Sequence, residues 1–204
     1  MLLAISRIIG APVMSLQTGQ PLCRLTSPII NPYNLRVVAF YVDGPRLDFR
    51  PAVVFTEDIR EFGGLGAIVD SSDNVMSPEG MVRLNKIISY NFTLDRLLVY
   101  DEKGTKLGRV MGYIVDPLNF EIEQLQVHPG IIKSLSTSEL LIHRRQIVKV
   151  EPNRITVKAA INKQPHKQTT LDDARRILNP EFDNPFRHNR PVTNRGESTT
   201  KTNI

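Results

Sequence analysis

Ile30-Asn-Pro-Tyr-Asn-Leu-Arg-Val-Val-Ala-Phe-Tyr-Val42 is the stretch that decides the fold, because it recurs 85 residues later as Val115-Asp-Pro-Leu-Asn-Phe-Glu-Ile-Glu-Gln-Leu-Gln-Val127. Each stretch opens on an Asx-Pro turn, in which proline presets φ and the Asx side chain bonds nearby backbone groups. Each then continues as an extended run. In the second, Leu125 and Val127 alternate with glutamines, which is the period of a half-buried strand. The sequence therefore predicts the same turn and strand twice.

The repeat extends on both sides of this stretch. Gly19-Gln-Pro-Leu-Cys-Arg-Leu25 aligns with Gly104-Thr-Lys-Leu-Gly-Arg-Val110 at the same offset, and Ala52–Ile59 aligns with Leu140–Ile147 at an offset of 88. Self-similarity over this length indicates a duplicated unit. Short extended runs separated by turns favour small β-barrels, in which closure of the sheet removes exposed edges. We expect a mainly all-β chain with two tandem small β-barrels, in residues 1–75 and 90–160.

A helical pattern follows each copy. After the first, Ser77 can cap a helix, Pro78 suits its first turn, and apolar residues then recur on one face. This pattern predicts a linker helix within residues 76–89. After the second copy, Thr170–Leu178 combines a capping threonine, two aspartates in the first turn and an Asn-Pro stop, which predicts another short helix.

Residues 161–204 are predicted to be this short helix and a flexible basic tail. From Asn179 onward the chain is rich in Asn, Arg, Pro, Thr and Ser, and so few aliphatic side chains cannot offset the entropy of ordering. We expect this C-terminal tail to be disordered. Phe182 and Phe186 are a candidate recognition motif within it, and the alternative is an inert, solvated tail.

Composition and charge narrow the class of protein. Hydrophobic residues make up 41% of the 204 residues, enough for a core. The single cysteine, Cys23, excludes an internal disulfide and a cysteine-based zinc site, indicates a reducing compartment, and is predicted to be a small core residue. The net charge of +5 lies mostly in the tail and is weak support for nucleic-acid binding.

The N-terminal residues do not read as a targeting segment. Met1–Gly10 is apolar but short and is interrupted by Arg7, and no apolar run approaches the length of a membrane helix. We expect a soluble, cytoplasmic protein with no direct membrane insertion.

Several short motifs, taken together, resemble the PRC-barrel family. The opening Pro12-Val13, the turn Thr18-Gly-Gln-Pro-Leu22, and Leu98-Val-Tyr-Asp-Glu-Lys-Gly-Thr-Lys-Leu-Gly-Arg-Val110 are similar to its strand, glycine turn and Leu-Gly-basic-Val strand. Ile142–Val150 and Asn153–Val157 are similar to its later strands. The resemblance covers roughly residues 3–160, and copy one departs from it at Pro21 and Cys23, where the family pattern has a polar residue and a glycine.

The resemblance implies a barrel of six or so strands with a short helix. The family includes the cytoplasmic barrel of the photosynthetic reaction-centre H subunit and the C-terminal domain of the bacterial ribosome maturation factor. Its motifs are turn and core residues, and it has no shared catalytic residues to carry over. Fold does not by itself determine function.

We find no pattern that predicts catalysis, a cofactor or a metal ion. The four histidines, at positions 128, 143, 166 and 188, lack metal-site spacing. Phe62-Gly-Gly-Leu-Gly66 leads into a strand and not a helix, so it is predicted to be a turn and not a phosphate loop. The protein is predicted not to be an enzyme.

One polar cluster remains, formed by His143, Arg144, Arg145 and Lys149. Copy one has Phe55, Thr56 and Glu57 at the first three positions, so the shared fold does not require these charges. On the assumption that they lie in a strand, the two arginines would point to opposite faces. The cluster is either a site for phosphates or an acidic partner surface, or simply solvated charge.

These observations predict a non-catalytic adaptor or scaffold that binds another protein. The alternative is a ribosome-maturation or RNA-associated factor that binds ribosomal protein or RNA, as one member of the family does. The sequence identifies neither the partner nor the oligomeric state.

Overall fold

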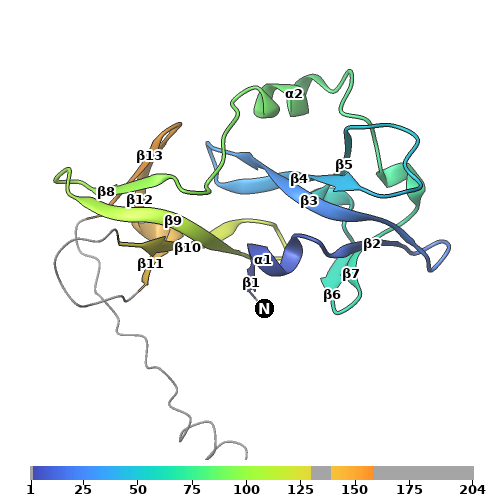
Figure 1. Cartoon of the computed structure of the whole chain (residues 1–204), viewed down its shortest axis with the longest axis horizontal. Helices are drawn as coiled ribbons and strands as arrows, with labels where there is room; N and C mark the ends of the chain where they lie inside the picture. Colours follow the sequence, from blue (N-terminus) through green and yellow to red (C-terminus); the bar gives the residue numbers. More distant parts are fainter. Residues whose placement is uncertain (1, 130–138, 159–204) are drawn as a thin grey trace, which may run out of the picture. The chain divides into compact units, whose positions relative to one another are not determined.

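The computed structural model describes residues 2–129 and 139–158, and its strands form two separate sheets (Figure 1). The first sheet holds β2 (Pro12–Ser15), β3 (Pro21–Asn31), β4 (Arg36–Asp43), β5 (Ala52–Phe55), β6 (Glu61–Gly63) and β7 (Gly66–Val69). The second holds β8 (Leu98–Asp101), β9 (Lys106–Val115), β10 (Ile122–His128), β11 (Leu140–His143), β12 (Ile147–Glu151) and β13 (Arg154–Val157), joined by β1 (Leu3–Ala4).

The two sheets share one strand order. It is β5-β4-β3-β2-β7-β6 in the first and β11-β10-β9-β8-β13-β12 in the second, and each has a single parallel pair, β2–β7 and β8–β13. In each sheet the first edge strand leads into a 3-10 turn, η1 (Thr56–Asp58) or η3 (Arg144–Gln146), and then into the other edge strand. The all-β class and the repeat are therefore confirmed.

Closure into barrels is not confirmed. Within residues 2–129 and 139–158, no ladder joins β5 to β6 or β11 to β12, so both sheets are open. A separate contact covers the edge of β5, because Val53 exchanges two backbone hydrogen bonds with Met76, of 2.8 and 3.0 Å.

The predicted turns follow the Asx chemistry that the sequence indicated. The Tyr33 N–H donates to Asn31 Oδ1 at 3.0 Å, and at the repeated position the Leu118 N–H donates to Asp116 Oδ1 at 3.1 Å. Asp101 Oδ1 likewise accepts two backbone N–H groups in the hairpin that follows β8. Side-chain acceptors thus hold the backbone at each of these turns.

The helix predicted within 76–89 begins later than expected. α2 spans Val82–Ile88, and Ser77 caps no helix but accepts the backbone N–H of Glu79 at 3.3 Å. The reason is Gly80, whose φ of +75° interrupts the turn before the helix starts. Leu84 of α2 is buried in a small cluster on the first sheet, made of Ile29, Ala39 and Val53.

The N-terminal residues pair with the second sheet and not with the first. Leu3 lies opposite Val115 and Ala4 opposite Ile114, both in β9, and the short helix α1 (Ile5–Ile8) also contacts β9. Leu3 and Ala4 are thus held by copy two, although they lie within the range 1–75 predicted for the first barrel.

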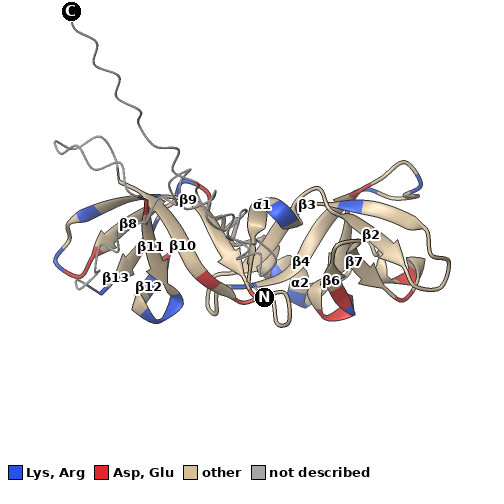
Figure 2. Ribbon diagram, turned by 90° about the horizontal axis from the view of Figure 1, so that it is seen from below, with Lys and Arg blue, Asp and Glu red and all other residues tan. Residues whose placement is uncertain are grey.

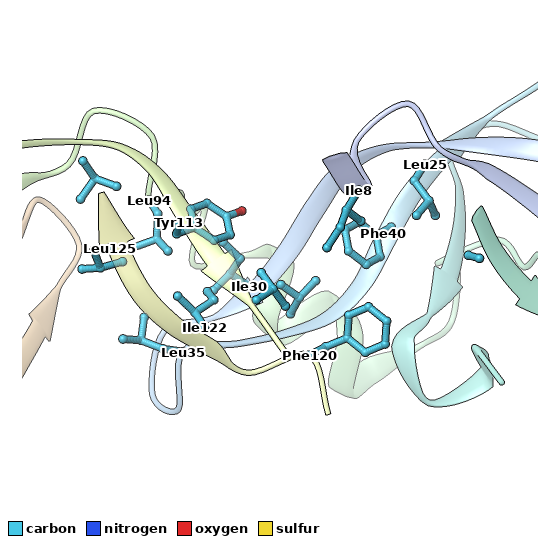
Figure 3. Close-up of a cluster of buried hydrophobic side chains, with 14 of the residues drawn as sticks. Ile8, Leu25, Ile30, Leu35, Phe40, Leu94, Tyr113, Phe120, Ile122 and Leu125 are labelled. Atoms are coloured by element: carbon cyan, nitrogen blue, oxygen red, sulfur yellow. The ribbon is translucent and has the colours of Figure 1, made fainter. Parts of the chain in front are cut away.

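One hydrophobic cluster includes buried side chains of both sheets. Phe40 of β4 and Phe120, just before β10, meet edge to face with ring centroids 6.0 Å apart (Figure 3). Both rings are almost fully buried, and burial of a side chain of this size stabilises the folded state by about 1.5–3 kcal/mol. Cys23 is buried in the same cluster, which confirms its predicted place in the core, and this burial, followed by the charge of Asp43, raises the pKa of its thiol to about 11.

The two copies meet at a backbone seam that relates equivalent residues. The Val37 N–H donates to Phe120 O at 3.0 Å, and the Ile122 N–H donates to Leu35 O at 2.9 Å. Between these bonds Arg36 is paired with Glu121, the residue 85 positions later. The contact of Val37 with Phe120 and the contact of Leu35 with Ile122 are the same contact made in opposite directions, because the offset of 85 residues relates them. The seam therefore has the pattern of a twofold interface between subunits, here within one chain.

No helix in the described part of the chain is long and apolar enough to cross a membrane. The predicted helix at 170–178, the basic tail and the candidate motif of Phe182 and Phe186 lie outside the described residues.

Candidate functional site

The four residues of the predicted cluster have different environments. His143 ends β11, Arg144 and Arg145 lie in η3, and Lys149 lies in β12. The arginines were expected to occupy opposite faces of a strand, and this is wrong, because the chain forms a 3-10 turn between β11 and β12 instead. The cluster must therefore be considered residue by residue.

Arg144 is directed into the seam between the copies. Its Nη1 donates to Leu35 O and to Ile122 O, each at 3.1 Å, and its Nη2 donates to Asn34 O at 2.6 Å. Glu121 lies 3.8 Å from Nη2, and only 27% of the arginine side chain is exposed. A guanidinium that donates to the backbone of both copies holds the two copies together and has little capacity left for a partner.

Thr56 occupies the equivalent position in copy one and makes only the contact within its own copy. It is buried, and its hydroxyl donates to Val37 O at 3.0 Å, the repeat partner of Ile122 O. The shorter threonine does not reach the other copy. Arg144 thus serves as a side chain long enough to bond across the seam. The sequence alone did not indicate this role.

Arg145 and Lys149 are exposed, and further charged residues extend their surface. Glu151 receives hydrogen bonds from Arg154 Nε at 2.7 Å and from Lys149 Nζ at 2.9 Å. These two bonds, that of Arg154 foremost, lower the pKa of the Glu151 carboxyl from its ordinary 4.5 to about 2. We call Arg145, Lys149, Arg154 and Lys158 the basic end of the chain, and Glu151 is the carboxylate that Lys149 and Arg154 contact within it. Sequence reasoning missed Arg154 and Lys158 because they lie on β13 and just beyond it.

The same places in copy one carry the opposite charge. Eighty-eight residues earlier, Glu57 replaces Arg145, Glu61 replaces Lys149 and Asp70 replaces Lys158. Figure 2 shows acidic residues on β6 and basic residues around β12 and β13. We call Glu57, Asp58, Glu61 and Asp70 the acidic end, and Arg60 is the cation that contacts Asp70 within it.

The acidic end is crowded with like charge. Partial burial, followed by the neighbouring charge of Glu57, raises the pKa of the Asp58 carboxyl above its ordinary value. Asp70 has the opposite shift, because Arg60 donates to both of its oxygens, at 2.9 and 2.7 Å, and this lowers its pKa. The equivalent turns of the two copies therefore carry side chains of opposite charge.

His143 lies beside the basic end but is held by its own turn. Its backbone N–H donates to Gln146 Oε1 at 2.8 Å, and its side-chain Nδ1 is buried with no partner among the described residues. Across residues 2–129 and 139–158 there is no group of three His, Cys, Asp or Glu side chains placed to hold a metal ion.

Comparison with known proteins adds no assignment. No protein-family model matches the chain, and no curated protein matches it.

Proposed function

We propose that this protein is a non-catalytic adaptor of the PRC-barrel type whose basic end binds an acidic partner protein. The observation that carries the proposal is the reversal of charge between equivalent ends. Since copy one builds the same turn and strands with Glu57 and Glu61, the fold does not require Arg145 and Lys149. Charges that the scaffold does not need are free to serve recognition.

The different environments of Arg144, Arg145 and Lys149 support the basic end as the binding surface. Arg144 has its donors engaged by three backbone carbonyls. Arg145 and Lys149 are exposed, and Lys149 makes one bond, to the carboxylate of Glu151. The partner surface therefore consists of Arg145, Lys149, Arg154 and Lys158, with Arg144 as its support. Val148, 51% exposed and next to Lys149 in β12, adds an exposed apolar side chain to this part of the chain.

The barrel part of the proposal is supported by the curved path of each copy. The two edge strands of a sheet are consecutive in the chain and only one 3-10 turn apart, and the strand order is the same in both copies. A sheet whose edges are joined by so short a turn is strongly coiled, as a small barrel requires.

The test is an affinity pulldown from native extract with the full-length chain, with and without nuclease. The variant Arg145→Glu/Lys149→Glu is compared with Lys103→Glu/Lys106→Glu, which changes the net charge equally on the β8–β9 hairpin. A discrete protein that survives nuclease, is lost with the first variant and is kept with the second supports the proposal. Capture that is equal for both variants would refute this surface.

The same experiment addresses the RNA-associated alternative. Ribosomal proteins that disappear after nuclease treatment would replace the adaptor with a ribonucleoprotein role. Binding to RNA through the basic end would also weaken steeply with salt, because phosphate contacts release counterions.

A further inference from the structure

The acidic and basic ends have the same backbone framework and opposite charges. Glu57 lies in η1 and Glu61 begins β6, and at the repeated positions Arg145 lies in η3 and Lys149 lies in β12. The spacing of the two carboxylates along this framework therefore matches the spacing of the two cations. Because the two ends share one framework, an acidic end that faces a basic end in the antiparallel sense brings the first charged position of one opposite the second of the other, so that opposite charges meet.

We propose that a second copy of this chain is a partner of the basic end, with the acidic end of the second chain docked on it. In this arrangement Glu57 of one chain lies opposite Lys149 of the other, and Glu61 lies opposite Arg145. The inference deepens the proposed function, on which it rests, by naming an acidic partner that fits the surface.

Exposed apolar residues are present at both ends as well. Leu65, in the turn between β6 and β7 of the acidic end, is 69% exposed, and Val148 of the basic end is 51% exposed. At the repeated positions, Leu65 corresponds to Asn153 and Val148 corresponds to Arg60. The exposed apolar residue therefore stands at a different position in each end. A polar rim around a small apolar contact is the usual anatomy of a protein interface.

The proposed contact is heterologous, since it joins the acidic end of one chain to the basic end of another. This determines the kind of assembly that can form. Each chain carries one acidic and one basic end, so docking leaves an unused end on both partners and further chains can add. The charges are exposed, so salt screens them over about 10 Å at 0.1 M ionic strength. We expect short, salt-sensitive oligomers that grow with concentration and not a closed dimer.

Sedimentation velocity of the nuclease-treated, full-length protein tests this at low and high salt. The wild type is expected to sediment faster as its concentration rises in roughly 0.02 M salt and to be monomeric in about 0.5 M salt. Arg145→Glu/Lys149→Glu and Glu57→Lys/Glu61→Lys should each weaken association by about tenfold or more, because like charges then face each other. Lys103→Glu/Lys106→Glu and Glu79→Lys/Glu102→Lys are the matched controls of equal net charge change and should associate like the wild type.

Mixing the two end variants gives the deciding result. One variant keeps only the acidic end and the other keeps only the basic end, so each alone should associate weakly, and an equimolar mixture should associate again. A wild type whose sedimentation does not depend on concentration at low salt overturns the inference, and so does a mixture that stays monomeric. If the wild type is monomeric while Arg145→Glu/Lys149→Glu still loses an extract partner, self-docking fails and the proposed function stands. If the chains self-associate but no other protein is captured from the extract, self-docking stands and the adaptor role toward other proteins fails.

Discussion

Replacement of Arg144 by alanine should destabilise the protein far more than the same change at its neighbour Arg145. Arg144→Ala removes three charge-assisted bonds to backbone carbonyls. Each such bond contributes about 1.5–3 kcal/mol when its surroundings are dry. The bond to Asn34 O is exposed, so water replaces it, and Leu35 O still accepts the N–H of Ile122. The loss then amounts to little more than one full bond, about 2–4 kcal/mol of unfolding free energy.

Urea unfolding followed by circular dichroism measures this directly. With a slope of about 2 kcal/mol per molar urea, the midpoint for Arg144→Ala should fall by roughly 1–2 M. Arg145→Ala, exposed in the same turn, should stay within about 0.5 kcal/mol of the wild type. Arg144→Lys should recover only part of the loss, because an ammonium group lacks the planar fork that reaches three carbonyls.

Two results would refute the reasoning. If Arg144→Ala unfolds at the wild-type urea concentration, the guanidinium does not hold the seam. If both alanine variants are equally destabilised, the effect belongs to the η3 turn and not to the contacts of Arg144 across the copies.

Four further outcomes follow from the structure. Thr56→Val should cost about 1–2 kcal/mol in urea unfolding, because it leaves Val37 O without the buried hydroxyl donor, and an unchanged midpoint would contradict this. Gly66→Ala should cost about 3 kcal/mol or more, since φ is +96° and the added Cβ would lie 2.2 Å from Pro12 O, whereas Gly19→Ala, in open space at φ +66°, should cost only about 1 kcal/mol. The pKa of Glu151 falls from 4.5 to about 2 on folding, so its stabilisation is complete above pH 4.5 and is lost as pH falls towards 2; acid titration of Glu151→Gln should lack this component. Cys23, buried and with its pKa raised to about 11, should react with iodoacetamide at neutral pH about 100-fold more slowly in the native than in the urea-unfolded protein, and equal rates would show that the thiol is accessible.

The repeat could be recognised in the sequence because its signals are local. Proline, asparagine and glycine at turns act within four residues, and alternation in Glu121–Val127 reports one strand, so β4, β10 and both Asx turns were predicted correctly. Cys23 was predicted to be buried from the apolar residues beside it. Each of these features depends on near neighbours in the chain.

The features that were missed depend on contacts between distant residues. The role of Arg144 is set by carbonyls more than 100 positions earlier, at Leu35 and Asn34, and no pattern in residues 140–150 encodes that distance. The start of α2 at Val82 reflects the backbone of Gly80 and the packing of Leu84 on the first sheet. Charge in a sequence shows what a side chain can do, and only its surroundings show whether it is already engaged.

The pairing of Arg36 with Glu121 at the centre of the seam bears on how this chain can change over time. In a dimer of identical subunits every substitution appears twice, so a cation added at one end is added at the other. Fusion of the two copies in a single polypeptide removes this constraint and keeps the seam intact at any protein concentration. One half can then become acidic and the other basic, and Arg144 can reach across the seam from one side while Thr56 serves the other, each altered by a single codon.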